Sequence, residues 1–176
     1  TVVLDQTVQD VKKVENGFFR LITDTDVHYS KSILITAGVG AFQPRRLNLE
    51  NAMAYEGKNI HYFLNDLNSF TGKRVGIFGG GDSAVDWAVM IEPIADSVNI
   101  VHRLYQFRAH EHSVNNLKNS RVEILTPYNP VQIEGNGEKM KRVVIQKVKA
   151  DEKKVVELDE MVVSYGLVSS LGPIKD

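Results

Sequence analysis

The sequence predicts an α/β fold in which a three-layer domain with a parallel sheet also carries an antiparallel β-meander. The central observation is a short apolar run at residues 75–78, followed by three glycines and by a stretch, 84–91, that is apolar except for Asp86. Pro93 ends this expected helix, and a second apolar run follows at 98–101. A strand, a glycine turn, a helix and a second strand form a β-α-β unit, whose two strands are parallel.

The segments before this unit alternate apolar and polar residues or form short apolar runs, which is typical of strands. They are residues 8–15, 18–23, 27–30 and 33–35, the last expected to be a buried strand. Asn16-Gly17 favours a type I′ hairpin turn between the first two segments.

The segments after the unit predict a further helix, a third parallel strand and the meander. Val114 and Leu117 lie three apart in a polar stretch, as in a helix with a narrow buried stripe. The expected strands are the parallel strand 121–126, the meander strands 131–134, 143–148 and 155–158, and 161–163, which returns to the parallel sheet.

The composition is that of an ordinary globular protein of one or two domains. The 176 residues carry a net charge of −1, which gives no indication of a nucleic-acid or acidic-lipid partner. The longest apolar runs, near 33–42 and 84–91, are too short to cross a bilayer, so no membrane span is expected. The absence of cysteine fits a reducing compartment, and we expect a cytoplasmic protein.

The glycine turn predicts a binding site for a pyrophosphate. It reads Gly79-Gly80-Gly81-Asp82-Ser83-Ala84, and the whole segment is assigned to the site. Backbone amides of such a turn approach the phosphates, which lie at the positive end of the following helix dipole. Gly79 would allow the tight turn, Gly81 a close approach to the ligand, and Ala84 close packing of helix on strand.

Asp82 and Ser83 each have two interpretations. The Ser83 hydroxyl could bind a phosphate, while both residue types also favour helix capping without any ligand. For Asp82 capping is preferred, because a carboxylate beside a pyrophosphate is repelled unless it points away. A glycine turn that serves packing alone is the alternative for the whole motif.

The residues after the second strand predict which dinucleotide binds. An acid there would accept hydrogen bonds from a free ribose 2′-hydroxyl, whereas a cation suits a 2′-phosphate. Residues 99–108 contain no acid, and they include Arg103 and Arg108, whose guanidinium groups can each make two bonds to phosphate oxygens. We therefore predict NADPH as the cofactor. His102 could stack on the adenine or contact the ribose, or it could be a partly exposed residue at a strand end.

Neither a metal site nor a catalytic side chain is predicted. His110 and His112 are two residues apart, so they would point to different sides of a helix. An evident acid, base or nucleophile is lacking, which suits hydride transfer between bound rings, because that reaction needs alignment more than proton handling.

The segment 75–109, above all the glycine turn with His102-Arg103 and Phe107-Arg108-Ala109, resembles the NADPH domain of low-molecular-weight thioredoxin reductases. Within that group it most resembles the thioredoxin-reductase-like ferredoxin–NADP reductases. Residues 33–45 resemble the segment that leaves their flavin domain, and 165–172 resemble the return into it. The resemblance implies a Rossmann-like fold, FAD as second cofactor, hydride transfer between NADPH and FAD, ferredoxin or a similar small carrier as electron acceptor, and a homodimer of the intact protein.

The resemblance also implies a division of the chain. Residues 1–56 would be part of an FAD-binding domain, 57–166 the NADPH-binding domain and 167–176 the return into the FAD domain. Ala37 and Gly38 could approach the flavin, or they could form a simple turn. Because the flavin domain of the resembled family has a further glycine motif earlier in its chain, we expect a fragment that binds NADPH, holds FAD poorly and is inactive alone.

Two departures from the resembled family bear on function. Dithiol reductases carry Cys-x-x-Cys before the strand that leads to the glycine turn, and this chain has no cysteine, so it cannot exchange disulfides. Leu104 stands where the family often has another arginine, which makes Arg108 more important for the 2′-phosphate. A thioredoxin-reductase-like protein without its dithiol and a non-catalytic NADP(H)-binding module remain the alternatives.

Overall fold

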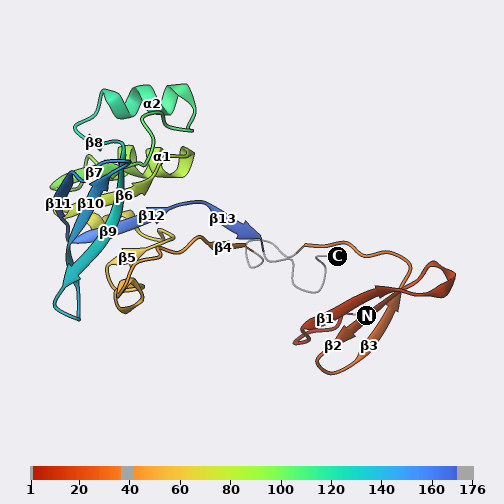
Figure 1. The fold of residues 1–176 in the computed structure, drawn as a ribbon. Helices are drawn as coiled ribbons and strands as arrows, with labels where there is room; N and C mark the ends of the chain where they lie inside the picture. Colours follow the sequence, from red (N-terminus) through yellow and green to blue (C-terminus); the bar gives the residue numbers. More distant parts are fainter. Residues whose placement is uncertain (1, 37–41, 170–176) are drawn as a thin grey trace. The chain divides into compact units, whose positions relative to one another are not determined.

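The computed structural model describes residues 2–36 and 42–169. The chain divides into two compact units, residues 1–43 with 167–176, and residues 44–166 (Figure 1). The second unit begins earlier than the sequence boundary at residue 57 because Leu47, Ala52 and Tyr55 are buried in a core cluster of that unit.

The first unit contains an antiparallel sheet with the order β1-β2-β3. Its strands are β1 (Val8–Lys13), β2 (Phe19–Thr23) and β3 (Val27–Ser30), which confirms the expected hairpin and third strand. The predicted two-residue type I′ turn is wrong. Val14 N donates to Phe18 O at 2.8 Å, which leaves Glu15 in the loop together with Asn16 and Gly17.

The predicted buried strand at 33–35 does not form. Leu34 is 88% exposed and Ile35 is 51% exposed, and neither lies in a strand. An apolar run becomes a buried strand only where other strands pair with it and side chains cover its faces, and among the described residues nothing does so here. Further along, β4 (Phe42–Pro44) and β13 (Leu167–Ser169) form a two-stranded sheet.

The second unit is built on a five-stranded sheet in which every pairing is parallel. The strand order is β5-β12-β6-β7-β8, with bounds Ile60–His61, Glu160–Ser164, Arg74–Gly79, Ser97–Val101 and Glu123–Leu125. This confirms the predicted parallel strands and places the strand that bears the glycine turn, β6, in the centre. The β-α-β unit is therefore flanked by β12 on one side and β8 on the other.

Helices cover one face of this sheet and the meander covers the other (Figure 1). Val75 and Ile77 pack with α1 (Asp82–Ile91) and α2 (Glu111–Lys118), whereas Phe78 belongs to the cluster on the meander side. The meander strands are β9 (Tyr128–Gly135), β10 (Met140–Lys147) and β11 (Lys153–Glu157), paired antiparallel. The alternation of side chains along β6 thus produces the three layers that the sequence predicts.

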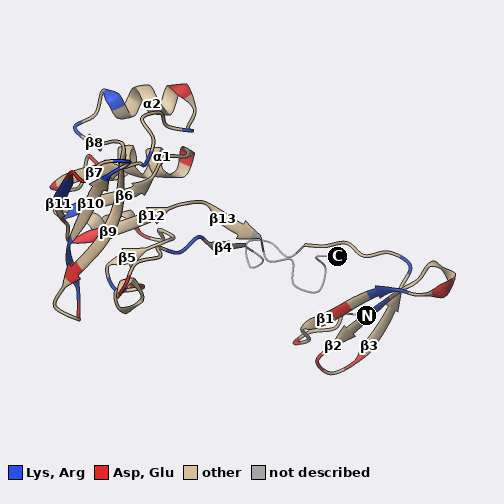
Figure 2. Ribbon diagram, viewed as in Figure 1, with Lys and Arg blue, Asp and Glu red and all other residues tan. Residues whose placement is uncertain are grey.

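The meander carries residues of both charge signs (Figure 2). Arg142 pairs with Glu134 at 2.6 Å, and Lys147 pairs with Glu152 at 2.9 Å. Exposed pairs of this kind stabilise a fold little, so the meander is held mainly by its buried face. Among the described residues, none of the helices is long and apolar enough to cross a membrane.

A buried carboxylate marks the amino ends of the parallel strands. Glu160 is 6% exposed, and its carboxylate lies 2.7 Å from His61 Nε2 and 2.5 Å from Lys73 Nζ. Burial raises the pKa of Glu160, but the bonds from His61 and Lys73 outweigh burial and hold this pKa below its ordinary value. This cluster joins β12, β5 and the start of β6 at the sheet edge opposite to the glycine turn, so its role is structural.

Candidate functional site

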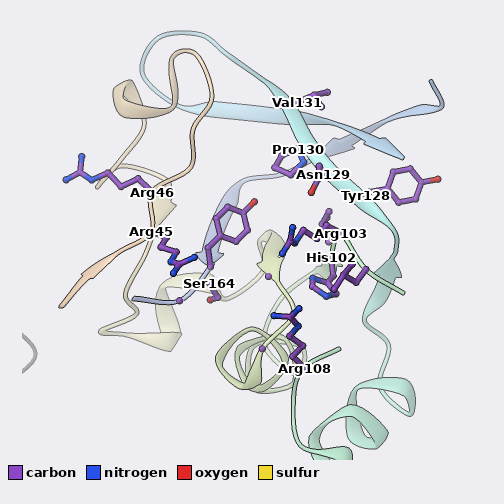
Figure 3. Close-up of a pocket in the computed structure, with 17 residues that line it drawn as sticks. Arg45, Arg46, His102, Arg103, Arg108, Tyr128, Asn129, Pro130, Val131 and Ser164 are labelled. Atoms are coloured by element: carbon purple, nitrogen blue, oxygen red, sulfur yellow. The ribbon is translucent and has the colours of Figure 1, made fainter. Parts of the chain in front are cut away.

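A cavity of about 890 Å³ opens at the carboxyl ends of β12, β6 and β7 (Figure 3). This volume is within the usual range for small-molecule and cofactor sites, and such sites lie at the carboxyl ends of parallel strands. The lining comes from five parts of the second unit, namely residues 45–46, 79–81, 101–104 with 108, 128–131 and 164–166.

The three glycines of the turn are needed for three different reasons. Gly79 has φ +154°, and an added Cβ would lie 2.4 Å from the carbonyl oxygen of Ser164 and 3.0 Å from the Cβ of Ala84. A Cβ on Gly80 would lie 2.3 Å from ring atoms of His102. Gly81 has nothing within 4 Å of its Cβ position, so its backbone is open to the cavity. Fold packing requires the first two glycines, and the third leaves room for a ligand.

Ala84 and Ser83 do not line the cavity. Ala84 is fully buried beside Gly79, which agrees with the close helix-to-strand packing predicted for it. Ser83 is exposed in the first turn of α1. A phosphate in this cavity would therefore meet the backbone amides at this helix end rather than the Ser83 side chain.

Asp82 has a different role from the capping of its own helix. The N-cap residue of α1 is Gly81, which precedes Asp82, and no side chain caps that helix. Instead, Asp82 Oδ1 accepts a hydrogen bond of 2.8 Å from the backbone N–H of His110, the residue before α2. Its carboxylate is thereby turned away from the cavity, and it joins the amino ends of the two helices.

The loop after β7 is attached to the glycine turn by backbone contacts. Arg108 N donates to Gly80 O at 2.6 Å, and Gly81 forms a parallel bridge with Arg108. Together with the Asp82–His110 bond, these contacts hold the loop against the turn. The two segments that the sequence assigns to pyrophosphate and 2′-phosphate therefore form one preassembled wall.

Arg103 and Arg108 both line this cavity and are exposed. In Figure 3 their guanidinium groups lie near His102, on the wall that follows β7. Within the described ranges, neither arginine forms an ion pair, so both cations are available to an anionic ligand. The structure brings together the residues that the sequence proposes for a 2′-phosphate.

His102 is a packing residue in this wall. It is 9% exposed, its ring stacks on Phe107 with centroids 5.4 Å apart, and Nε2 has no partner among the described atoms. The sequence allowed His102 to be a partly exposed residue at the strand end, but its side chain is buried. Burial lowers the pKa of His102, and the nearby Arg103 and Arg108 cations lower it further, so the neutral form of the ring is favoured. Because Phe107 stacks on the ring and Gly80 packs against it, adenine stacking is not favoured.

Sequence reasoning missed part of the lining. Ser164 ends β12, and Tyr165 and Gly166 follow it, so the rule that ligands bind at strand carboxyl ends could have identified them. Arg45 gave no such signal, because it precedes the glycine turn by a long stretch of chain. The fold brings it to the cavity through a 3.0 Å hydrogen bond from Arg45 N to Gly166 O.

Ala37 and Gly38 are outside the described residues, so their approach to a flavin stays a prediction. His112 lies in α2 and contacts Asn116 at 3.3 Å. Within the described ranges, no group of three His, Cys, Asp or Glu side chains is placed to hold a metal ion.

Comparisons with known proteins agree with this geometry. Over all 176 residues the chain is 55% identical to ferredoxin–NADP reductase 2 of Bacillus velezensis and 57% identical to ferredoxin–NADP reductase 2 of Listeria innocua. In both cases the match covers 100% of this chain and 53% of the relative, so the chain spans about half the length of these relatives.

Solved structures show the same fold. Thioredoxin reductase of T. acidophilum matches with a TM-score of 0.85 at 26% identity, over 97% of this chain and 55% of that one. Lactococcus lactis thioredoxin reductase matches with a TM-score of 0.84 at 25% identity, over 97% and 56%. The resemblance to thioredoxin-reductase-like ferredoxin–NADP reductases is confirmed. A family model matches residues 1–176 in full, and the chain belongs to the pyridine nucleotide-disulphide oxidoreductase family.

Proposed function

We propose that residues 44–166 bind NADPH and that the chain is the NADPH-binding part of a flavin-dependent ferredoxin–NADP reductase. The observation that supports this most is the junction of the glycine turn with Arg103 and Arg108 in one cavity. A pyrophosphate fits at Gly81, where the amino end of α1 opens to the cavity. A 2′-phosphate fits at the two arginines, whose guanidinium groups match phosphate oxygens.

The charge of the cavity supports an anionic ligand. Its lining contains four arginines and no Asp or Glu. A dinucleotide with an additional 2′-phosphate carries negative charge at two separate places, and this lining offers cations near both. A concave site lined by cations also raises the local concentration of an anionic ligand.

Arg103→Ala is expected to weaken NADPH binding by about 1.5–3 kcal/mol, the scale of a hydrogen bond to a charged group, and to leave NADH nearly unchanged. The reason is that NADH lacks the 2′-phosphate. Isothermal titration calorimetry with both nucleotides measures the difference. Arg142→Ala in the meander, whose side chain pairs with Glu134, is the matched control and should change neither affinity. Equal losses for NADPH and NADH would refute the assignment of Arg103.

The electron-transfer function rests on the curated relatives named ferredoxin–NADP reductase, which are about twice as long as this chain. FAD, when bound, would accept a hydride from the nicotinamide and pass single electrons to a carrier. The described residues of this chain bind and orient the dinucleotide, and hydride transfer depends on that alignment. Because this chain contains no cysteine, a dithiol of its own is not part of the proposal.

A protein of the relatives' length that contains residues 1–176 is expected to purify yellow with FAD and to reduce ferredoxin with NADPH, but not thioredoxin. The 176-residue chain alone is expected to bind NADPH without FAD and to reduce neither acceptor. Flavin absorbance and the two reductase assays test this, and sedimentation velocity tests the proposed homodimer of the longer protein. A colourless longer protein, or one that reduces thioredoxin, contradicts the proposed activity even if NADPH still binds.

A further inference from the structure

We propose that Arg45 is a third cationic ligand of the dinucleotide and that it binds the nicotinamide half, at the phosphate or ribose on that side. This inference rests on the proposed function, because it names a further residue of the same site. It assigns Arg45 to a part of the ligand different from the part assigned to Arg103 and Arg108.

Position along the sheet edge separates Arg45 from the other two arginines. Arg45 is hydrogen-bonded through its backbone to Gly166, which follows β12, whereas Arg103 follows β7. The strands β12 and β7 flank β6 on opposite sides, so the glycine turn lies between the two arginines. In Figure 3 the Arg45 side chain extends beside Ser164, at the β12 side of the cavity.

A dinucleotide bound along this edge has a fixed direction. Its pyrophosphate lies at the glycine turn, and its adenosine 2′-phosphate lies at the β7 side with Arg103. The nicotinamide half then extends to the β12 side, where Arg45, Ser164 and Tyr165 line the cavity. Arg45 is therefore the cation that faces the half of the ligand that Arg103 and Arg108 do not reach.

The Arg45 guanidinium is available for this contact. Its side chain is exposed, and within the described parts of the chain it makes no ion pair. The neighbouring Arg46 differs, because its guanidinium pairs with Glu56 at 3.0 Å, and Glu56 also accepts a 2.7 Å hydrogen bond from the Tyr62 hydroxyl. Two adjacent arginines at one cavity thus have different states, one paired and one open to a ligand.

A purely structural role for the Arg45 side chain is not supported by its contacts. The contact that fixes residue 45 beside Gly166 is made by the backbone N–H, which alanine also provides. Replacement of the side chain should therefore leave the fold unchanged and remove only the cation. This makes Arg45 suitable for a test that separates ligand binding from stability.

The test is isothermal titration calorimetry of the 176-residue chain with two probes, NADPH and 2′-phospho-AMP, which is the adenosine half alone. Arg45→Ala is expected to weaken NADPH binding about 10-fold or more and to change 2′-phospho-AMP binding less than twofold. Arg103→Ala should weaken both probes. Arg45→Lys, which keeps a cation, should recover part of the NADPH affinity. Arg142→Ala, which removes a cation outside the cavity lining, is the control and should change the affinity for neither probe.

The outcomes distinguish this inference from the function on which it rests. If the unchanged chain binds neither probe, the proposed NADPH site fails. If it binds both, and Arg45→Ala leaves NADPH binding unchanged or weakens 2′-phospho-AMP equally, the assignment of Arg45 to the nicotinamide half is wrong. Circular dichroism of each variant confirms that the compared chains are folded.

Discussion

Gly81→Ala is expected to weaken NADPH binding by about 3 kcal/mol or more, which is at least a 100-fold loss, without lowering the stability of the fold. Two costs add. A methyl group pushed against a close-packed ligand costs about 1–3 kcal/mol, and a phosphate displaced from backbone amides loses charge-assisted hydrogen bonds of about 1.5–3 kcal/mol each. Neither cost lowers the stability of the unliganded fold, because nothing lies within 4 Å of the new Cβ position.

Calorimetry with NADPH and urea denaturation of the same sample test this prediction together. NADH should lose affinity as well, because it carries the same pyrophosphate. The single 5′-phosphate of 2′-phospho-AMP corresponds to one half of that group, so this probe should lose less affinity than NADPH. This pattern differs from that of Arg103→Ala, which affects only ligands with a 2′-phosphate. A Gly81→Ala chain that is equally stable and binds NADPH as tightly as the unchanged chain would show that the pyrophosphate does not lie at this turn.

Gly79→Ala is expected to lower the free energy of unfolding by about 2–6 kcal/mol, the sum of an overpacking cost and a backbone-strain cost. The added Cβ would lie 2.4 Å from the backbone oxygen of Ser164, which cannot move without disturbing β12. Overpacking of this kind costs about 1–3 kcal/mol, and a non-glycine residue at φ +154° adds backbone strain of about 1–3 kcal/mol. The position is therefore restricted by the fold itself, whether or not a ligand is present.

Urea denaturation followed by circular dichroism measures this loss. Gly81→Ala is the matched control, because it adds the same methyl group two residues away at a position with free space. A Gly79→Ala chain within about 0.5 kcal/mol of the unchanged chain would contradict the strain argument, since changes of that size are ordinary for unconstrained surface sites.

The sequence predicted the centre of the site better than its edges. The strand, glycine turn and helix at 74–91 formed as expected, and Arg103 and Arg108 lie at the cavity as expected. These features depend on short-range patterns, namely a buried run, a turn in which two positions require glycine, and cations in the segment that follows a strand. Such patterns act over a few residues, so one sequence is enough to find them.

Asp82 and His102 show where local reasoning was incomplete. Helix-start statistics suggest that Asp82 caps α1, but its carboxylate binds the backbone N–H of His110 across 28 residues. His102 follows a strand and was open to several roles, but in the fold it packs between Phe107 and Gly80. Both outcomes depend on which loops meet in space, and the residue types alone do not specify that.

The sequence by itself determined the three-layer α/β fold of the second unit, the location of its glycine turn and the cations next to that turn. Side-chain alternation along strands and the conformational freedom of glycine are properties of the local chain, so they are readable without a structure. Only the tertiary structure placed Arg45 at the cavity and left 33–35 outside any sheet. Those outcomes are set by pairing between segments far apart in the chain, through hydrogen bonds such as Arg45 N to Gly166 O.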